Sequence, residues 1–304
     1  QGAIRAHPYV LREMRAAKEM AGAEAAREFD DALTSHIGHV ISNGVRALVY
    51  GLTHASFAPV PGNSSPETRH YFRHISRLSA AFAFLADMSM LAMGGALKRK
   101  EKISGRLGDV LSMMYLVSAT LKRYEDQGRL REDLPLVRWS VRDALYHAQQ
   151  AIDQILSNFP VKSLATLLRF VVFPLGMPWR PPLDSRNHEC ARIALEPGAA
   201  RDRLTAGMFI PRNESEATGQ LEAALLAAVA CEPIEKKLRE AAKAGTPDPE
   251  SALNAEELAQ WQRKEALRKN VIKVDDFPQD FGRAEIVRAS QDEMREKPVS
   301  ARAA

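Results

Sequence analysis

Hydrophobic side chains recur every three or four positions along the first half of the chain, which is the period of a helix with one apolar face. Residues 8–57 show this spacing and are rich in Ala, Leu, Glu and Arg, which are good helix formers. The apolar positions in this stretch include Leu33, Ile37, Val40 and Ile41. The pattern predicts a helix from about Pro8 to Phe57.

The segment "APVPGNSSPETR" interrupts this pattern, because its Pro, Gly and Asn-Ser-Ser residues are typical of a loop. It predicts a loop from about Ala58 to Pro66, with Ser65 as the cap of the next helix and Pro66 in its first turn. Further breaks at "GGALKRKEK" and "YEDQGRLREDLP" divide residues 67–160 into three long helices. In the second break, Gly128 is the expected C-terminal cap and Pro135 is expected to open the third helix.

Each of the three helices carries one apolar stripe. Long helices joined by short loops pack antiparallel as a bundle, and no segment here alternates apolar and polar residues as a strand would. The predicted fold class is therefore all-α, with a helical bundle over residues 67–160. The stripes are Tyr71, Phe72, Ile75, Leu78, Phe82, Leu85 and Met88; Ile103, Leu107, Val110, Leu111, Met114, Val117 and Leu121; and Leu136, Val137, Val141, Leu145, Ala148, Ile152 and Ile155.

The remainder of the chain is less regular. Residues 161–287 are predicted to form smaller helices and irregular segments, beginning with the irregular "FPLGMPWRPPLD". Helices are expected near 221–230, 233–244 and 254–269. The polar tail, residues 288–304, is predicted to be disordered.

Composition narrows the class of protein. Hydrophobic residues make up 45% of the chain and charged residues 26%, as in soluble globular proteins. The net charge of +4 is spread along the chain and accompanies no recognisable nucleic-acid fold, so no nucleic-acid partner is expected. Cys190 and Cys231 are too few for a disulfide framework or a thiolate zinc site.

The most apolar stretch is "LATLLRFVVFPLGMPW", Leu164 to Trp179. It is too short to span a bilayer, which takes about 20 apolar residues, and Arg169 and two prolines interrupt it. A buried segment is the simpler interpretation. Peripheral contact with a membrane is the alternative, because Arg169, Trp179 and Arg180 are residue types found at membrane interfaces.

Two histidine pairs lie one helical turn apart, His36 with His39 and His70 with His74. Such pairs can bind a metal, but neither carries the glutamate of an HExxH motif and no third ligand can be assigned beside them. Packing or surface roles are the preferred interpretation, and no metal site is predicted. No catalytic residue is predicted either, because no nucleophile or carboxylate pair stands out.

Glycines near a basic run could in principle hold a phosphate. Gly94 and Gly95 precede "LKRKEK", residues 97–102, and Gly105 and Gly108 follow it, but no phosphate-binding loop motif is present. The basic run is predicted to be a solvated turn, with a phospholipid or nucleotide contact as the alternative. Gly105 and Gly108 are interpreted as positions where a neighbouring helix approaches closely.

Four long segments carry a resemblance to a known family. They are "QGAIRAHPYVLREM", "HIGHVISNGVRALVYGLT", "YFRHISRLSAAFAFLADMSMLAMGGALKRKEKISGRLGDVLSMMYLVSATLKRYEDQGR" and "DLPLVRWSVRDALYHAQQAIDQILSNFP". Together with "VVFPLG" and "VDDF" at 274–277, they resemble the C-terminal region of the bacterial-type long-chain acyl-CoA dehydrogenases. The resemblance runs from Gln1 to about Phe277. It implies that residues 1–57 end the helical core of the dehydrogenase and that the later helices form a C-terminal extension.

The resemblance also implies the activity of the parent protein. Members of this family use FAD to oxidise a fatty acyl-CoA to the trans-2-enoyl-CoA in fatty-acid β-oxidation, and pass the electrons to an electron-transfer flavoprotein. Their catalytic glutamate belongs to a Glu-Gly motif that would lie upstream of Gln1, so neither Glu13 nor Glu101 is assigned that role. The residues that contact FAD stay unknown, and FAD is not expected to bind this segment alone.

Two interpretations of this region remain, a supporting part of an enzyme and a non-catalytic module. It is expected to serve subunit packing or membrane docking in a homo-oligomeric enzyme of the bacterial cytoplasm, with peripheral contact to the inner membrane. Related membrane-associated enzymes for very long chains carry a comparable extension. The alternative is a non-catalytic all-α interaction or membrane-peripheral scaffold module, which composition alone fits equally well.

Overall fold

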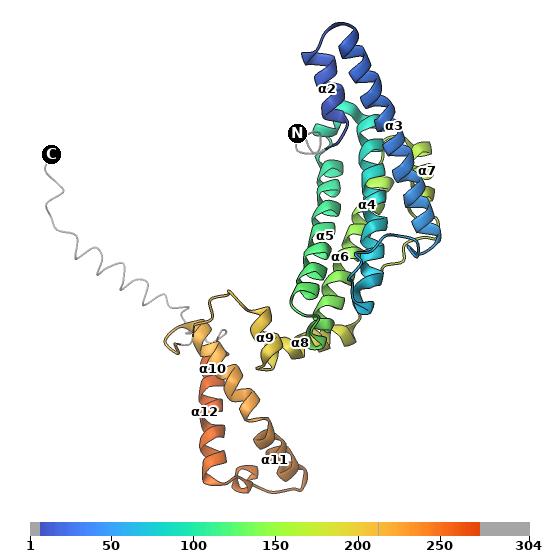
Figure 1. Ribbon diagram of the computed structural model, residues 1–304. Helices are drawn as coiled ribbons and strands as arrows, with labels where there is room; N and C mark the ends of the chain where they lie inside the picture. The colour runs from blue at the N-terminus through green and yellow to red at the C-terminus, as the bar shows by residue number, and fades with distance from the viewer. Residues whose placement is uncertain (1–6, 212, 274–304) are drawn as a thin grey trace, which may run out of the picture. The chain divides into compact units, whose positions relative to one another are not determined.

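The computed structural model describes residues 7–211 and 213–273. These residues form helices and connecting loops, with no strand in either range, so the all-α prediction is confirmed (Figure 1). The chain forms two compact units, residues 1–191 and residues 192–304. The "VDDF" motif at 274–277 and the predicted disordered tail at 288–304 lie outside the described residues.

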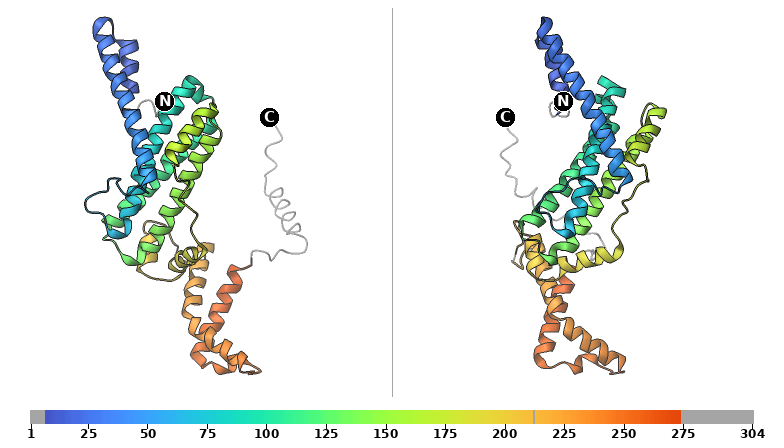
Figure 2. Two further views of the ribbon diagram at one scale, coloured as in Figure 1. Left: turned by 90° about the vertical axis from the view of Figure 1, so that its right-hand side faces the viewer. Right: turned by 45° about the vertical axis from the view of Figure 1, so that its right-hand side comes forward.

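The first unit begins with a helical hairpin made of α2 (Val10–Glu19) and α3 (Gly22–Leu52). The sequence predicted one helix from Pro8 to Phe57, and the structure divides it in two. The backbone is extended at Met20 and has φ +71° at Gly22, a value in the left-handed region that glycine adopts without strain. The chain therefore reverses, and α2 lies along α3 (Figure 2). Arg12 on α2 pairs with Glu28 and Asp31 on α3 across the hairpin.

Three long helices follow, as predicted: α4 (Pro66–Met93), α5 (Glu101–Asp126) and α6 (Leu134–Ser157). They run antiparallel and are joined by short connections that include 3₁₀ turns at Gly94–Lys98 and Arg131–Asp133. Ser65 and Pro66 stand at the start of α4 as expected, although the Ser65 hydroxyl lies 2.9 Å from the Thr68 hydroxyl instead of binding a backbone N–H. Gly128 has φ +91° just beyond the end of α5, which ends the helix.

The core of the first unit forms where the predicted stripes meet. Large side chains with less than 2% exposure include Leu85 from α4, Val110 and Leu121 from α5, and Ile152 from α6. Leu111 is an exception, because it turns outward with 53% exposure. Phe159, just after α6, is also fully buried. Burial of such side chains stabilises the bundle by about 1.5–3 kcal/mol each relative to exposure.

The segment Pro66–Lys98 has the length and apolar composition of a helix that could cross a membrane. Helices at the centre of a protein bundle have the same composition. Here Ala80, Ala81 and Leu85 are buried against the neighbouring helices, so packing within the bundle accounts for these apolar positions.

The apolar run after α6 forms α7 (Lys162–Val172), which packs on α3 and α6. The first compact unit therefore contains α7 and the irregular segment after it, which the sequence grouped with the smaller helices at 161–287. Pro174 lies against Gly51 of α3, at a point where a Cβ atom on residue 51 would lie 2.7 Å from the Pro174 ring. Gly105 and Gly108 have no neighbour within 4 Å of such an atom, so the prediction of close helix approach at these two glycines is wrong.

Helix α8 (Asp184–Leu195) runs across the boundary between the two units. The second unit then contains α9 (Ala199–Leu204), α10 (Ala217–Ala230), α11 (Glu232–Lys243) and α12 (Ala255–Val271), with a 3₁₀ turn at Pro249–Ala252.

The three longer helices of the second unit match the predicted ones closely. Helix α10 packs on α12, and Asn254 caps α12 in a capping box with Glu257. Cys231 and Ile234 are buried side chains of this unit. The amine of Lys264 lies 2.7 Å from the Glu235 carboxylate, which links α12 to α11.

The contact between Gly51 and Pro174 generates a prediction about stability. We expect Gly51→Ala to lower the free energy of unfolding by about 1–3 kcal/mol, because the added methyl meets a rigid ring. Gly38→Ala, on the same helix but with open space around it, is the matched control and should raise the free energy of unfolding by about 0.5–1 kcal/mol. Urea unfolding followed by circular dichroism measures both. Equal effects of the two substitutions would contradict the close contact.

Candidate functional site

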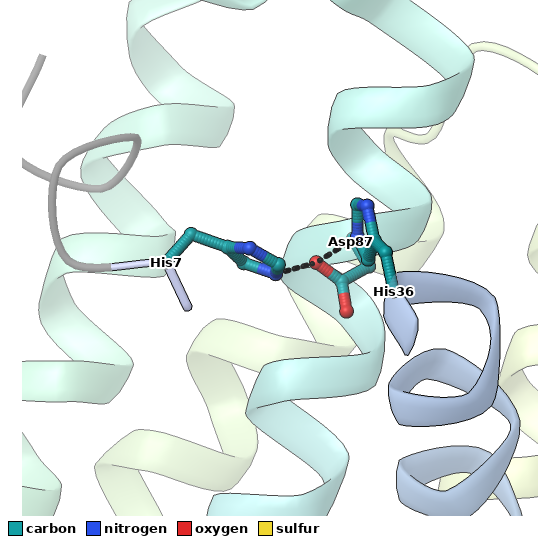
Figure 3. Close-up of side chains that lie close together, drawn as sticks. All are labelled: His7, His36 and Asp87. Carbon is teal, nitrogen blue, oxygen red and sulfur yellow. Dashed lines mark hydrogen bonds and ion pairs between the residues drawn. The ribbon is translucent and has the colours of Figure 1, made fainter. Parts of the chain in front are cut away.

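A cluster of ionisable side chains lies where the start of α2, helix α3 and helix α4 meet. His7 precedes α2, Glu13 lies on α2, His36 lies on α3, and Asp87 lies on α4. His7 and Asp87 are separated by 80 positions in the sequence. Figure 3 shows the Asp87 carboxylate between the two imidazole rings, with one of its oxygens facing both.

The distances define a compact site. The Nε2 atom of His7 lies 2.9 Å from Asp87 Oδ1, and the Nε2 atom of His36 lies 3.7 Å from the same oxygen. On the far side of the His36 ring, Nδ1 lies 2.7 Å from Glu13 Oε1. The Asp87 side chain is only 3% exposed, so its charge is held away from water and depends on these neighbours.

Two buried polar atoms in the site have no hydrogen-bond partner among the described residues. They are His36 Nε2 and Asp87 Oδ2. Leaving a buried polar group unpaired costs about 1–3 kcal/mol, and more when the group is charged. Such atoms in a folded protein call for an explanation such as a bound ion, a water or a proton.

His7 also fixes the beginning of α2. Its Nδ1 atom accepts hydrogen bonds from the backbone N–H groups of Tyr9 (3.2 Å) and Val10 (3.1 Å). This leaves the proton of the neutral ring on Nε2, which donates to Asp87. Burial lowers the pKa of His7, while the nearby Asp87 charge acts in the opposite direction.

The histidine pairs noted in the sequence do not act as pairs in the fold. His39 lies close to the cluster, but its Nε2 accepts a hydrogen bond from Asn43 Nδ2 at 2.9 Å. The neighbours of the His36 ring are instead His7, Glu13 and Asp87. The sequence analysis did not connect these residues to His36. No local signal could have identified them, because the helical hairpin and α4 are brought together only by folding.

In the second pair, His70 packs against the Tyr71 ring, whereas His74 lies beside Trp179. The ring of His74 meets the edge of the Trp179 indole, with 4.8 Å between ring centroids. Gln149 holds the backbone of Trp179 with two hydrogen bonds of 3.0 Å. The sequence analysis placed Trp179 in a run that could face a membrane. In the structure it packs against His74 and Gln149.

Burial strongly affects the two basic groups beside Trp179. It lowers the pKa of His74 from 6.5 to about 4, with a smaller contribution from the positive charge of Arg77. Burial also lowers the pKa of Arg77, whose Nη2 donates to the Val172 carbonyl oxygen at 3.2 Å. His74 is therefore a neutral, buried side chain at ordinary pH.

Two hollows among the described residues of the first unit do not fit a flavin. The cavity bounded by His74, Arg77 and Trp179 has a volume of about 30 Å³, which is room for one or two water molecules. A wider hollow near Arg129 and Arg138 is open to solvent and is lined mainly by charged side chains, whereas cofactor pockets are mostly apolar. Glu13 and Glu101, which were not assigned the role of catalytic base, line neither of these two hollows.

Comparison with known proteins gives one positive result. The family model described as "Acyl-CoA dehydrogenase, C-terminal, bacterial type" matches residues 4–277, which is most of the chain. No solved structure matches this chain.

The lowered pKa of His74 generates a prediction about pH. His74 takes up a proton near pH 6.5 in the unfolded chain but only near pH 4 in the folded chain. The free energy of unfolding therefore decreases as the pH falls from 6.5 to 4. This residue should make the protein about 2 kcal/mol less stable at pH 5 than at pH 7.5. In His74→Gln that part of the pH dependence should disappear, as measured by urea unfolding at both pH values. His147→Gln, an exposed histidine on α6, is the control, and an equal reduction in both variants would contradict the assignment.

Proposed function

The chain belongs to the bacterial-type acyl-CoA dehydrogenase C-terminal family, and we propose that it works as the C-terminal region of an FAD-dependent enzyme that oxidises fatty acyl-CoA to trans-2-enoyl-CoA in fatty-acid β-oxidation. The extent of the family match, residues 4–277, carries this proposal. The flavin, the acyl-CoA and the catalytic glutamate belong to the dehydrogenase part of the enzyme. Electron-transfer flavoprotein is the proposed electron acceptor, and the enzyme is proposed to be a homo-oligomer.

Within such an enzyme, the region described here has a supporting role. The observation in favour is a row of exposed apolar side chains along α3. Its members lie four residues apart, so each is the neighbour of the next along a ridge that winds slowly around the helix, and each is at least 39% exposed. The row consists of Leu33, Ile37, Ile41, Val45 and Val49.

A row of this kind indicates an interface, because folded chains rarely leave contiguous apolar surface in water. Other positions of α3 already pack on α4, because Ala47 is buried and Gly44 lies against the Phe84 ring. The family resemblance assigns the α2–α3 hairpin to the end of the dehydrogenase core. We therefore assign the exposed row on α3 to contact with the rest of that core.

A peripheral membrane contact is a second candidate role, at the inner face of the bacterial cytoplasmic membrane. Helix α7 buries Ala165, Leu168 and Val172 but presents Leu167 (57%) and Phe170 (59%) outward. Arg169 on the same helix is held by Asp153 at 2.5 Å. Because Trp179 packs into the fold, the proposed membrane-facing surface is limited to the outer side of α7.

The role of α3 is tested in the full-length gene product. We expect Ile37→Glu/Ile41→Glu to reduce palmitoyl-CoA oxidation with an artificial electron acceptor, and flavin content, by about tenfold or more, since burying two unpaired charges costs several kcal/mol. In the 304-residue chain Ile37 and Ile41 are exposed, so its unfolding midpoint should change little. Leu111→Glu, exposed on α5, is the control and should leave both enzyme readouts unchanged.

Two outcomes would contradict this proposal. One is a full-length protein that does not oxidise palmitoyl-CoA, which removes the dehydrogenase assignment. The other is an Ile37→Glu/Ile41→Glu enzyme with normal activity and flavin content, which removes the role of α3 while leaving the dehydrogenase assignment in place.

The membrane role is tested separately by co-sedimentation of the chain with vesicles of phosphatidylglycerol and phosphatidylethanolamine. We expect Leu167→Asp/Phe170→Asp to reduce the bound fraction several-fold, because both side chains would otherwise enter the interface. Leu111→Asp, at an exposed apolar position away from α7, serves as the control. Binding that is unaffected by the α7 substitutions would remove this candidate role.

A further inference from the structure

The two unpaired atoms between α3 and α4, His36 Nε2 and Asp87 Oδ2, would be stabilised by a nearby positive charge. His36 Nδ1 is bonded to the Glu13 carboxylate, so the neutral ring carries its proton there and directs the lone pair of Nε2 toward Asp87. That lone pair and the negative Asp87 oxygen lie 3.7 Å apart and repel each other. A cation between them would remove this conflict.

We propose that His7, His36 and Asp87 bind one divalent transition-metal cation, for which Zn²⁺ is the best match. Their ligand atoms all lie within 4.8 Å of one another. Ligand atoms of a tetrahedral zinc site, each about 2.0–2.1 Å from the ion, lie about 3.3 Å apart. Two of the observed separations, 2.9 Å and 3.7 Å, bracket this value, so the site closes with a rearrangement of the His7 ring.

Glu13 completes the arrangement as an outer partner. Histidines that bind metals almost always donate their other ring N–H to a carboxylate or carbonyl oxygen, which orients the ring and makes it a better ligand. The 2.7 Å contact from His36 Nδ1 to Glu13 has this geometry. Glu13 is therefore a positioning residue that acts through His36.

His7 must rearrange for binding, and the structure allows this. To offer Nε2 to the ion, the ring moves its proton from Nε2 to Nδ1 and releases the N–H groups of Tyr9 and Val10. These residues are only partly buried at the start of α2, so water can replace the ring as acceptor. The freed Nε2 then turns from the Asp87 oxygen to the cation.

The ligand chemistry selects the kind of ion and its role. Two imidazole nitrogens and one carboxylate suit Zn²⁺, with a water in the fourth position, whereas Mg²⁺ and Ca²⁺ prefer oxygen ligands. The ligands come from the start of α2, from α3 and from α4. The ion therefore clamps the helical hairpin to the bundle. This inference rests on the described residues alone and does not depend on the proposed dehydrogenase function.

The test is calorimetric titration of ZnCl₂ into the chelator-treated chain. We expect one site, with affinity reduced about 100-fold or more in His36→Gln and in Asp87→Asn, and about 10–100-fold in Glu13→Gln. The matched control is His147→Gln, because His147 and Asp143 form an exposed histidine–aspartate pair one turn apart on α6. Its loss should leave the affinity unchanged.

A second measurement does not depend on any variant folding correctly. Co²⁺ added to the unmodified chain should give the intense visible absorption of a four-coordinate site, and one equivalent of Zn²⁺ should abolish it. No heat of Zn²⁺ binding together with no Co²⁺ absorption would overturn the proposal and leave a proton on His36 as the balancing charge. Equal loss of affinity in His147→Gln and His36→Gln would also overturn it, as surface binding.

Discussion

The shared apolar core of α4, α5 and α6 is the interaction on which the rest of the first unit depends. A helix satisfies most of its own backbone hydrogen bonds, so the arrangement of several helices is decided by the side chains they bury against one another. Leu85, Val110 and Ile152, one from each helix, belong to one buried cluster and are almost fully removed from water. This burial holds the three helices antiparallel and gives α3 and α7 a rigid surface to pack on.

The apolar core also determines where the polar cluster of His7, Glu13, His36 and Asp87 forms. Leu85 and Asp87 are close in sequence but lie on different faces of α4, so the packing that buries Leu85 also fixes the position of Asp87. A carboxylate with 3% exposure is stable only beside donors or positive charge. His7, which precedes the hairpin, donates to Asp87, and the proposed cation would supply positive charge beside His36, which Glu13 orients. The cluster is therefore a polar connection between two elements that otherwise meet through apolar contacts.

The outer surface of the unit differs from face to face. The outward side of α3 carries an apolar row, while Trp179, which could have extended an apolar surface beside α7, is half-buried against Gln149 and His74. The exposed large apolar side chains of α5 form a shorter group, Leu111, Tyr115 and Leu116. The longer row along α3 is the surface that we propose to contact the rest of the dehydrogenase core.

The sequence by itself determined the fold class and the positions of α4, α5, α6 and the longer helices of the second unit, because helical period and helix caps are local properties. It also identified the family, because the similarity extends over most of the chain. It missed the reversal near Gly22, where a positive φ in a helix-forming stretch breaks the continuous pattern. Only the tertiary structure decided which face of α3 is left open and that Trp179 packs inward. It also decided that His36 faces Asp87 instead of working with His39. These outcomes depend on residues far apart in the chain, 80 positions in the case of His7 and Asp87, and no periodicity within one helix encodes which residues of another will meet it.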